Sequence, residues 1–320
     1  MEINFKPRIG ISTCLLGESV RYNGGHLKDA FLTNTVSKYV EWVPVCPEAE
    51  SGMGIPREPV RLVEENGKVK MKGVKSKHDH SVTMEKWTQS RIDELKDSNL
   101  HGYVFTKDSP SCGLFRVKIY GTNDQVVLRN GRGKFADALS STFENLPVEE
   151  NGRLNDPRLR ENFIERVFVY KRWTELIEEG RSPKNLIDFQ SQLKLTLMAH
   201  SVVHYREAGR IVARAGIDEW NSITNEYENV LMSAMQRLAT AKKHANALQH
   251  AMGFLKQALS SDDKIELMGM IDQYRVGQLP IIVPVTLLRH HINKIGGPKW
   301  LTNQTYLDPY PSEMMLRNHV

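Results

Sequence analysis

Cysteine and long apolar runs are both scarce in this chain. Three cysteines occur among 320 residues. This number is small and odd, which excludes the disulfide framework of a small secreted protein. The longest strongly apolar stretch, residues 280–288, is far shorter than the roughly 20 residues that a membrane-spanning helix needs. The first ten residues also lack the apolar core and cleavage site of a secretory signal. We therefore expect a cytoplasmic protein that does not span a membrane.

The remaining composition is that of a globular protein. Hydrophobic residues make up 40% and charged residues 25% of the chain, which excludes disordered and collagen-like proteins. The length predicts about two domains. The formal net charge is +5, of which residues 151–320 contribute +4. This balance permits an anionic partner without requiring one, and it places the excess positive charge in the second half.

Short apolar runs alternate with helical segments over residues 1–146. This alternation predicts βαβ units, and hence an α/β domain of Rossmann-like type with a mainly parallel sheet. Pro44 cannot donate a hydrogen bond to a neighbouring strand, so the strand that contains it is not expected to be central. The predicted strands are residues 8–12, 41–45 and 102–106, and the predicted helical segments are residues 27–39 and 80–97.

Residues 147–157 are polar and rich in Asn, Gly and Pro, which predicts a linker. Beyond it, apolar residues recur at helical spacing, so we expect an all-α domain over residues 158–320. Asp156 can cap its first helix, with Pro157 at the first helical position. Further helices are predicted at residues 182–208, 218–259 and 262–274, followed by an apolar segment at 280–292 and an irregular tail.

Each of the three cysteines follows a predicted strand. Cys14 comes just after the first strand, Cys46 directly after the second, and Cys112 six residues after the third. Because the carboxyl ends of parallel strands share one edge of a sheet, we expect the three thiols to converge there. For any single cysteine, the alternative is a small side chain that fills the core. Their spacing matches no CxxC zinc pattern.

Three converging thiolates suit a 4Fe-4S cluster in which one iron has no protein ligand. Such an iron is an electrophile that can bind a soft atom, such as the sulfur of a substrate. Glu48 follows Cys46 closely and is a candidate general acid or base, with a solvated loop carboxylate as the alternative. Ser109 and Ser111 supply hydroxyls beside Cys112, although residues of this type also form turns.

Five short motifs, in this order, resemble the iron–sulfur thiouracil desulfidase family over about residues 7–146. The helical half is similar to a domain often fused to that family. Together they resemble the bacterial desulfidases that remove sulfur from 4-thiouridine in tRNA. The motifs are STCLLG (12–17), RYNGG (21–25), VCPE (45–48), IPR (55–57) and SPSCG (109–113), with RENFIER (160–166), LMAH (197–200) and PVTLLR (284–289) in the helical half.

The resemblance implies a 4Fe-4S cluster held by Cys14, Cys46 and Cys112. It also implies that Glu48 and Ser109 activate water and move protons while the thiocarbonyl becomes a carbonyl and sulfide leaves, with no net electron transfer. Substrate contacts are implied for Ser12, Arg21, Tyr22 and Ser111.

Two positions depart from the commoner family pattern. Val20 stands where many members have a further cysteine, which leaves the cysteine triad intact. Asn23 stands where many have Asp, which puts a catalytic carboxylate in that loop in doubt; its Asn-Gly-Gly run is typical of a tight turn.

The helical half bears on whether the substrate is a free base or a nucleic acid. If residues 193–214 form one helix, one basic face spans an arc of about 160° and holds Arg206, Arg210, Arg214, His200 and His204. Such cationic faces suit a phosphate backbone, whereas an ordinary solvated helix face is the alternative. The pair His200 and His204 could hold zinc, but no adjacent carboxylate completes a metalloprotease motif. The residues expected to bind tRNA are Arg206, Arg210, Arg214, Lys242 and Lys243.

Two hypotheses of different classes follow. The first is an enzyme that converts 4-thiouridine in tRNA to uridine and releases sulfide. The second is a non-catalytic iron–sulfur protein that binds RNA or senses redox state. Within the enzyme class, desulfuration of free thiouracil is a further alternative. No protein partner can be inferred.

Overall fold

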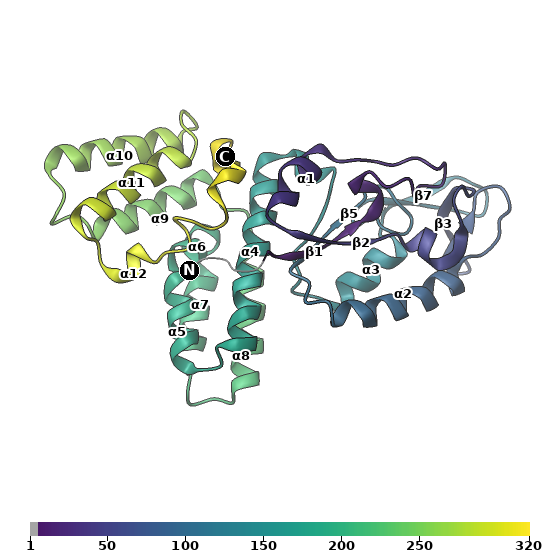
Figure 1. Ribbon diagram of the computed structural model, residues 1–320, viewed down its shortest axis with the longest axis horizontal. Coiled ribbons are helices and arrows are strands. Elements are labelled where there is room, and N and C mark those ends of the chain that lie inside the picture. Colours follow the sequence, from purple (N-terminus) through teal and green to yellow (C-terminus); the bar gives the residue numbers. More distant parts are fainter. Residues whose placement is uncertain (1–5) are drawn as a thin grey trace. The chain divides into compact units, whose positions relative to one another are not determined.

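The structure, a computed structural model, describes residues 6–320 and divides into two compact units (Figure 1). One unit ends at Asn155, and the other runs from Asp156 to Val320. Within residues 6–320, no helix combines the length and apolar character needed to cross a membrane. Residues 1–5, half of the segment whose composition argues against a secretory signal, lie outside the described residues.

Four parallel strands form the sheet that carries the cysteines. The strand order β2-β1-β5-β8 confirms the predicted α/β fold with a parallel sheet. All three predicted strands are present, and β2 lies at the sheet edge, where the missing N–H of Pro44 is tolerated. The strands are β1 (Arg8–Ser12), β2 (Glu41–Val45), β5 (Gly102–Phe105) and β8 (Val148–Glu150).

The strand order creates a switch point beside β1. After β1 the chain adds β2 on one side, and it later returns to add β5 on the other side. Loops that leave two such neighbouring strands diverge, so a crevice opens at their carboxyl ends. The residues that follow β1 and β5 therefore face each other across this crevice.

Two longer helices of this unit, α2 (Ser81–Lys96) and α3 (Lys134–Thr142), pack together, with the rings of Trp87 and Phe135 5.6 Å apart. Phe135 also packs against the aromatic side chains of β5. The predicted helical segment at 27–39 is helical only in α1 (Ala30–Asn34) and in a 3-10 turn at Val36–Lys38. The other short turns are 3-10 at Thr13–Leu16 and Arg153–Asn155, and π-helical at Ala49–Met53.

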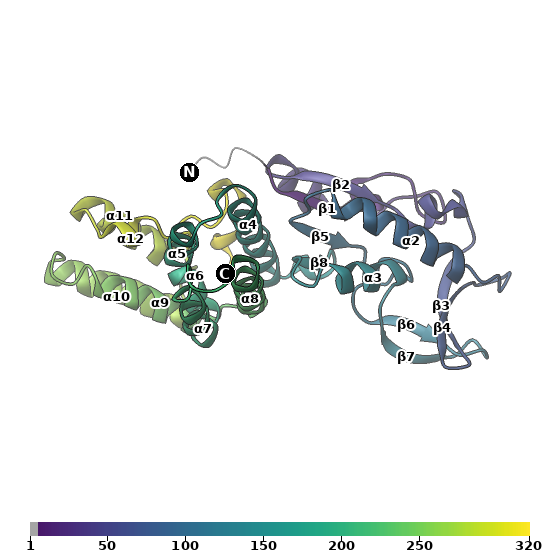
Figure 2. The same ribbon diagram turned by 90° about the horizontal axis from the view of Figure 1, so that it is seen from below.

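A second sheet in this unit was not predicted from the sequence. It is mixed, with order β4-β3-β6-β7, and Figure 2 shows it beside the parallel sheet. Its first hairpin turns at Asn66-Gly67, where both residues have positive φ, as a type I′ turn requires. The strands are β3 (Val60–Glu65), β4 (Lys68–Gly73), β6 (Val117–Tyr120) and β7 (Val126–Gly131).

The segment predicted as a linker, residues 147–157, is mostly ordered structure. It contains β8, which pairs with β5, and a 3-10 turn. The Glu150 carboxylate in β8 accepts hydrogen bonds from the backbone N–H groups of Leu114 and Phe115. This polar side chain therefore fixes β8 to another segment of the first unit. Polar composition alone did not reveal this role.

The second unit is all-helical, as predicted. Asp156 caps α4 by accepting the N–H groups of Arg158 and Leu159, with Pro157 at the first helical position. The helices are α4 (Pro157–Glu179), α5 (Pro183–Gln192), α6 (Lys194–His200), α7 (Val202–Val212), α8 (Trp220–Met235), α9 (Ala241–Gly253), α10 (Ser261–Arg275), α11 (Ile282–Ile295) and α12 (Lys299–Thr302), with 3-10 turns at Ser312–Met314 and Leu316–Asn318.

The prediction of one helix across residues 193–214 is wrong. The backbone of Ser201 is extended, with φ −161° and ψ 108°, and its side chain accepts the His204 N–H as the cap of α7. The helix direction therefore changes at Ser201, and residues on either side of it do not share one continuous face.

Candidate functional site

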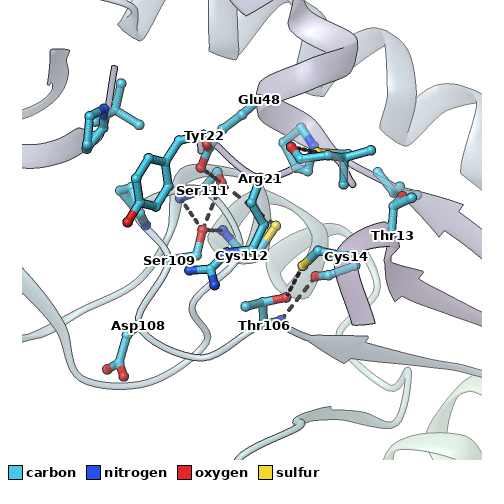
Figure 3. A pocket seen from close by; sticks show the side chains of 18 of the residues that line it. Thr13, Cys14, Arg21, Tyr22, Glu48, Thr106, Asp108, Ser109, Ser111 and Cys112 are labelled. Atoms are coloured by element: carbon cyan, nitrogen blue, oxygen red, sulfur yellow. Dashed lines mark hydrogen bonds between the residues drawn. The ribbon is translucent and has the colours of Figure 1, made fainter. Parts of the chain in front are cut away.

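The three cysteines line one cleft of about 260 Å³ at the carboxyl ends of the parallel strands. Cys14 and Cys112 are labelled in Figure 3. Cys14 lies in the 3-10 turn after β1, Cys46 follows β2 directly, and Cys112 lies in the loop after β5. All three are free thiols. The fold thus brings together three sulfur atoms that are far apart in the sequence.

Neighbouring polar atoms orient each thiol. The Cys14 Sγ lies 3.2 Å from the Thr106 Oγ1, across the switch point between β1 and β5. The Cys46 thiol points at the Val20 carbonyl oxygen 3.9 Å away. The Ser111 hydroxyl lies 3.8 Å from the Sγ of the buried Cys112, whose N–H donates to the Ser109 hydroxyl at 3.1 Å.

The loop that carries Cys112 is held by the start of α3. The N–H groups of Phe135 and Ala136 donate to the Ser111 carbonyl oxygen, and the Lys134 N–H donates to that of Pro110. Gly133 allows this close approach, because a Cβ there would lie 2.5 Å from the Ser111 carbonyl group. A glycine is therefore needed at the N-cap of α3, where Ser, Thr, Asp or Asn would otherwise be favoured.

A carboxylate stands beside the thiols in a defined hydrogen-bond chain. The Glu48 Oε2 accepts from Arg57 twice, from Nε at 3.0 Å and from Nη2 at 2.7 Å. The Glu48 Oε1 accepts from the Ser111 hydroxyl at 2.7 Å, and the Ser109 hydroxyl lies 2.9 Å from that of Ser111. Because Ser111 gives its proton to the carboxylate, Ser109 is the donor to Ser111. The chain runs from Ser109 through Ser111 to Glu48 (Figure 3).

The predicted substrate-binding residues also line this cleft, in different environments. Ser12 is buried, and its hydroxyl accepts the Thr106 N–H at 3.0 Å. Tyr22 is exposed, and the Arg21 guanidinium lies 5.7 Å from its ring centre. Within the described chain, no carboxylate forms an ion pair with Arg21, so its charge is available at the cleft.

The cleft opposes ionisation of its thiols. Burial raises the pKa of each of the three cysteines. The negative charge of Glu48 raises each pKa further, and the charge of Cys14 does so for Cys46 and Cys112. Three thiolates in this space therefore require positive charge from a bound group, as a metal centre supplies.

The donor set of the cleft fits a cluster. Three free thiols share the cleft, and the charges of Cys14 and Cys46 raise the pKa of Cys112. Thiolates are the protein ligands of iron–sulfur clusters, so each of the three could bind one iron of a cluster. Within residues 6–320, no group of three His, Cys, Asp or Glu side chains is arranged to hold a single metal ion.

Comparison with known proteins identifies the part of the chain that forms this cleft. Residues 9–151 match the family described as 2-thiouracil desulfurase. The chain carries a 2-thiouracil desulfurase domain. All three cysteines, Glu48 and Ser109 lie within this desulfurase domain. It is followed by a second match, residues 194–311, to the family described as protein of unknown function (DUF1722).

Individual relatives match only parts of the chain. The uncharacterized protein YbgA of Escherichia coli (strain K12) is 28% identical over 168 residues, which are 52% of this chain and 98% of that protein. The uncharacterized protein YbbK of Bacillus subtilis (strain 168) is 28% identical over 108 residues, which are 32% of this chain and 71% of that protein. A solved structure described as the 4Fe-4S-dependent thiouracil desulfidase TudS is 23% identical, with a TM-score of 0.39, and covers 47% of this chain and 95% of that chain.

The residues predicted to bind tRNA lie in the helical unit, and two of them have internal partners. Arg206, Arg210 and Lys242 are exposed, and none forms an ion pair within the described part of the chain. Arg214 lies beyond the end of α7 and pairs with Asp218 and Glu226.

Lys243, the other such residue, donates to the carbonyl oxygens of His200 and Leu238, and so holds the polypeptide at the start of α9. The placement of His200 on the predicted basic face is wrong. Its side chain is 1% exposed and lies 2.9 Å from the Glu165 carboxylate, so it faces the interior of the helical unit.

Sequence reasoning missed three residues that shape the cleft. Arg57 was part of a quoted motif, but its ion pair with Glu48 depends on a loop that brings the two together. Thr106 ends a predicted strand, which gives no indication that its hydroxyl contacts Cys14. Gly133 lies in a short Gly-Arg-Gly run that matches no phosphate-binding loop, and its role is the close approach to Ser111.

Proposed function

We propose that the protein desulfurates 4-thiouridine in tRNA, with a 4Fe-4S cluster held by Cys14, Cys46 and Cys112. The observation that carries this proposal is the arrangement of the cleft in the desulfurase domain. Three free thiols share it with a carboxylate–hydroxyl chain. When bound, the cluster would supply an electrophilic iron for the thiocarbonyl sulfur.

The residues of the chain supply the proton transfers. Arg57 holds one oxygen of Glu48, so the other oxygen stays directed at Ser111 and the carboxylate can act as a base. Water oxygen bonds to the carbon of the thiocarbonyl group, and its proton passes along Ser109 and Ser111 to Glu48. The carbon–sulfur bond then breaks, and the sulfur takes the proton held by Glu48 and the remaining proton of the added water, so that a thiocarbonyl and water become a carbonyl and hydrogen sulfide and Glu48 is ionised again. No electrons are transferred overall.

The preference for tRNA over a free base is supported by the exposed cations of the helical unit. Arg206 and Arg210 lie one turn apart on α7, and neither has a carboxylate partner among residues 6–320. Unpaired cations at such spacing suit consecutive phosphates of a nucleic-acid backbone. A free base offers them nothing to bind.

The test is anaerobic. The protein is reconstituted with iron and sulfide and incubated with bulk bacterial tRNA, and 4-thiouridine, 2-thiouridine and uridine are quantified by nucleoside chromatography. We expect 4-thiouridine to fall with release of sulfide. Glu48→Gln and Ser109→Ala should each lower the rate by about 100-fold or more while the iron–sulfur absorbance is retained.

The control for these variants is Glu85→Gln, at an exposed glutamate of the same unit. Unchanged 4-thiouridine with an intact cluster would refute the proposal. Equal turnover in Glu48→Gln and wild type would exclude Glu48 as the base. An intact cluster without turnover of tRNA or free thiouracil would favour the non-catalytic alternative. Turnover of free thiouracil without turnover of tRNA would favour the free-base alternative.

The tRNA contacts have a separate readout. Because each phosphate contact releases counterions, the affinity for tRNA should fall with rising salt. The double substitution Arg206→Gln and Arg210→Gln should weaken binding and reduce the salt slope by about 1 to 2. The paired residue Arg214 provides the control, because Arg214→Gln removes a cation that is already neutralised by two carboxylates. An unchanged slope in the double variant would place the tRNA elsewhere.

A further inference from the structure

The helical unit has a cleft of its own, with a volume of about 400 Å³. It is lined by residues of α4, the start of α9, the end of α10 and the segment 318–320, and it shares no residue with the cysteine cleft. Its volume lies within the range of small-molecule sites, about 300–1,000 Å³. Nothing in the desulfuration chemistry uses it.

Buried polar groups form the wall of this helical-unit cleft. Glu161, His244 and Tyr274 line it and are only 6%, 5% and 5% exposed. The Glu161 Oε1 accepts from Tyr310 and Arg317, but no residue among 6–320 hydrogen-bonds the Glu161 Oε2. Because this oxygen is not among the fully buried unpaired atoms of the described chain, it is open to the cleft and can accept a hydrogen bond from a ligand.

Two further polar atoms on side chains that line this cleft also have no hydrogen-bond partner within the described chain. The His244 Nδ1 lies 2.9 Å from the Tyr306 hydroxyl, whereas the His244 Nε2 has no hydrogen bond within the described chain. The Tyr274 hydroxyl likewise has none there, and its ring packs edge-on against that of His244, with the ring centres 6.1 Å apart. Three unpartnered polar atoms on buried side chains therefore meet one cleft.

These atoms offer complementary hydrogen bonds. Burial and the nearby charge of Arg317 lower the pKa of His244 to about 3, so its imidazole is neutral at physiological pH. The Tyr306 hydroxyl has no other acceptor in the described chain, so it donates to Nδ1, and the ring proton of His244 is on Nε2. The wall of the cleft thus offers both an N–H donor and a carboxyl acceptor.

The mouth of the cleft suits an anion. Thr240 caps α9 by accepting the Lys243 N–H, and the N–H groups of Ala241 and Lys242 have no backbone acceptor within residues 6–320. The exposed Arg158 side chain also lines the cleft and forms no ion pair in the described part of the chain. A helix N-terminus beside an unpaired guanidinium is a favourable place for a phosphate group.

We infer that the helical-unit cleft binds a nucleoside monophosphate, with the hydrogen-bonding edge of the base against Glu161 and His244 and the phosphate against Arg158 and the start of α9. Every nucleobase presents both hydrogen-bond donors and acceptors, which suits a wall that offers both. The ligand is either a free nucleotide or one nucleotide unit of an RNA strand. The inference requires neither the cluster nor desulfuration.

The test uses the full-length protein without iron. Calorimetric titrations with UMP, CMP, AMP and GMP, with the matching nucleosides and with inorganic phosphate measure free ligands. Titrations with short single-stranded RNA measure the polymer. We expect saturable binding of at least one nucleotide or of RNA, tighter than that of inorganic phosphate.

Three variants locate the site. Arg158→Gln should weaken nucleotide binding by about tenfold or more and leave nucleoside binding unchanged, because it removes only the phosphate contact. Tyr274→Phe should weaken the binding of both and leave thermal unfolding unchanged, since its hydroxyl has no partner to lose. Arg181→Gln, at an exposed arginine outside the cleft, is the control and should bind like wild type.

The outcomes distinguish the ligand sources. Nucleotide binding that Tyr274→Phe weakens identifies a free nucleotide, and RNA binding that Tyr274→Phe weakens, without nucleotide binding, identifies a unit of RNA. The inference is overturned if nothing binds, if inorganic phosphate binds as tightly as any nucleotide, or if Arg158→Gln and Tyr274→Phe bind like wild type. Because iron is absent, desulfuration can fail without affecting these results.

Discussion

Glu165 is expected to be a principal stabilising side chain of the helical unit. It is 1% exposed, and its Oε2 lies 2.9 Å from the His200 Nε2 while its Oε1 lies 3.5 Å from the Arg317 Nη2. Glu165→Gln keeps the shape of the side chain and removes its charge. The substitution leaves two buried basic side chains without this anion, which is far more costly than the loss of a surface ion pair.

The direction of the effect follows from the pKa of Glu165. Burial alone would raise this pKa, but the hydrogen bond and charge of His200, together with Arg317, hold it at about 2 instead of 4.5. The ionised form is therefore stabilised by its buried basic partners. Removal of one partner from a buried ion pair costs about 3–5 kcal/mol. We therefore expect Glu165→Gln to lower the free energy of unfolding of the helical unit by about 3 kcal/mol at pH 7.

The pH dependence provides a second check with a defined sign. Because the folded-state pKa is lower than the unfolded one, the stabilisation is fully present above pH 4.5 and is lost as the pH falls towards 2. The wild-type protein should lose this contribution over that window. The Glu165→Gln variant should lack that part of the pH dependence, since a glutamine does not titrate.

Urea unfolding followed by tryptophan fluorescence measures both effects, because Trp173 is buried in the same unit. The control is Glu178→Gln, at an exposed glutamate on the same helix, which should change the free energy of unfolding by less than about 0.5 kcal/mol. A Glu165→Gln variant within about 1 kcal/mol of wild type at pH 7 would show that the buried charges do not stabilise the unit as argued.

Three further predictions concern the desulfurase domain. Cys46→Ser should abolish most of the iron–sulfur absorbance after anaerobic reconstitution while the far-ultraviolet circular dichroism stays unchanged; full cluster loading would exclude Cys46 as a ligand. Arg57→Lys loses the contact of two guanidinium nitrogens with the Glu48 carboxylate. It should slow desulfuration by about 100-fold while the cluster absorbance is retained. An undiminished rate would contradict a positioning role for Arg57. Gly133→Ala places a Cβ 2.5 Å from backbone atoms and should lower the free energy of unfolding of the domain in urea by about 1–3 kcal/mol. The control is Gly209→Ala, whose Cβ would have no atom within 4 Å and which should not destabilise the protein. Equal stability of these two variants would refute the close-approach argument.

The sequence by itself determined the features that depend on neighbouring residues and on general topology. Alternating apolar runs identified three of the parallel strands, and Pro44 indicated that β2 is not central. Asp156 and Pro157 marked the start of α4, because capping is a local interaction. The position of each cysteine after a strand was enough to predict that the three thiols face one cleft, since parallel strands end at a common edge.

Only the tertiary structure decided which side chains face one another across long sequence separations. The contact between Cys14 and Thr106 and the Glu48–Ser111 hydrogen bond each join segments more than 60 residues apart. The buried pair of Glu165 and His200 joins residues 35 positions apart, and burial reversed the expected role of that histidine. Periodicity and composition describe a segment by itself, whereas partners, burial and charge balance depend on how the segments pack.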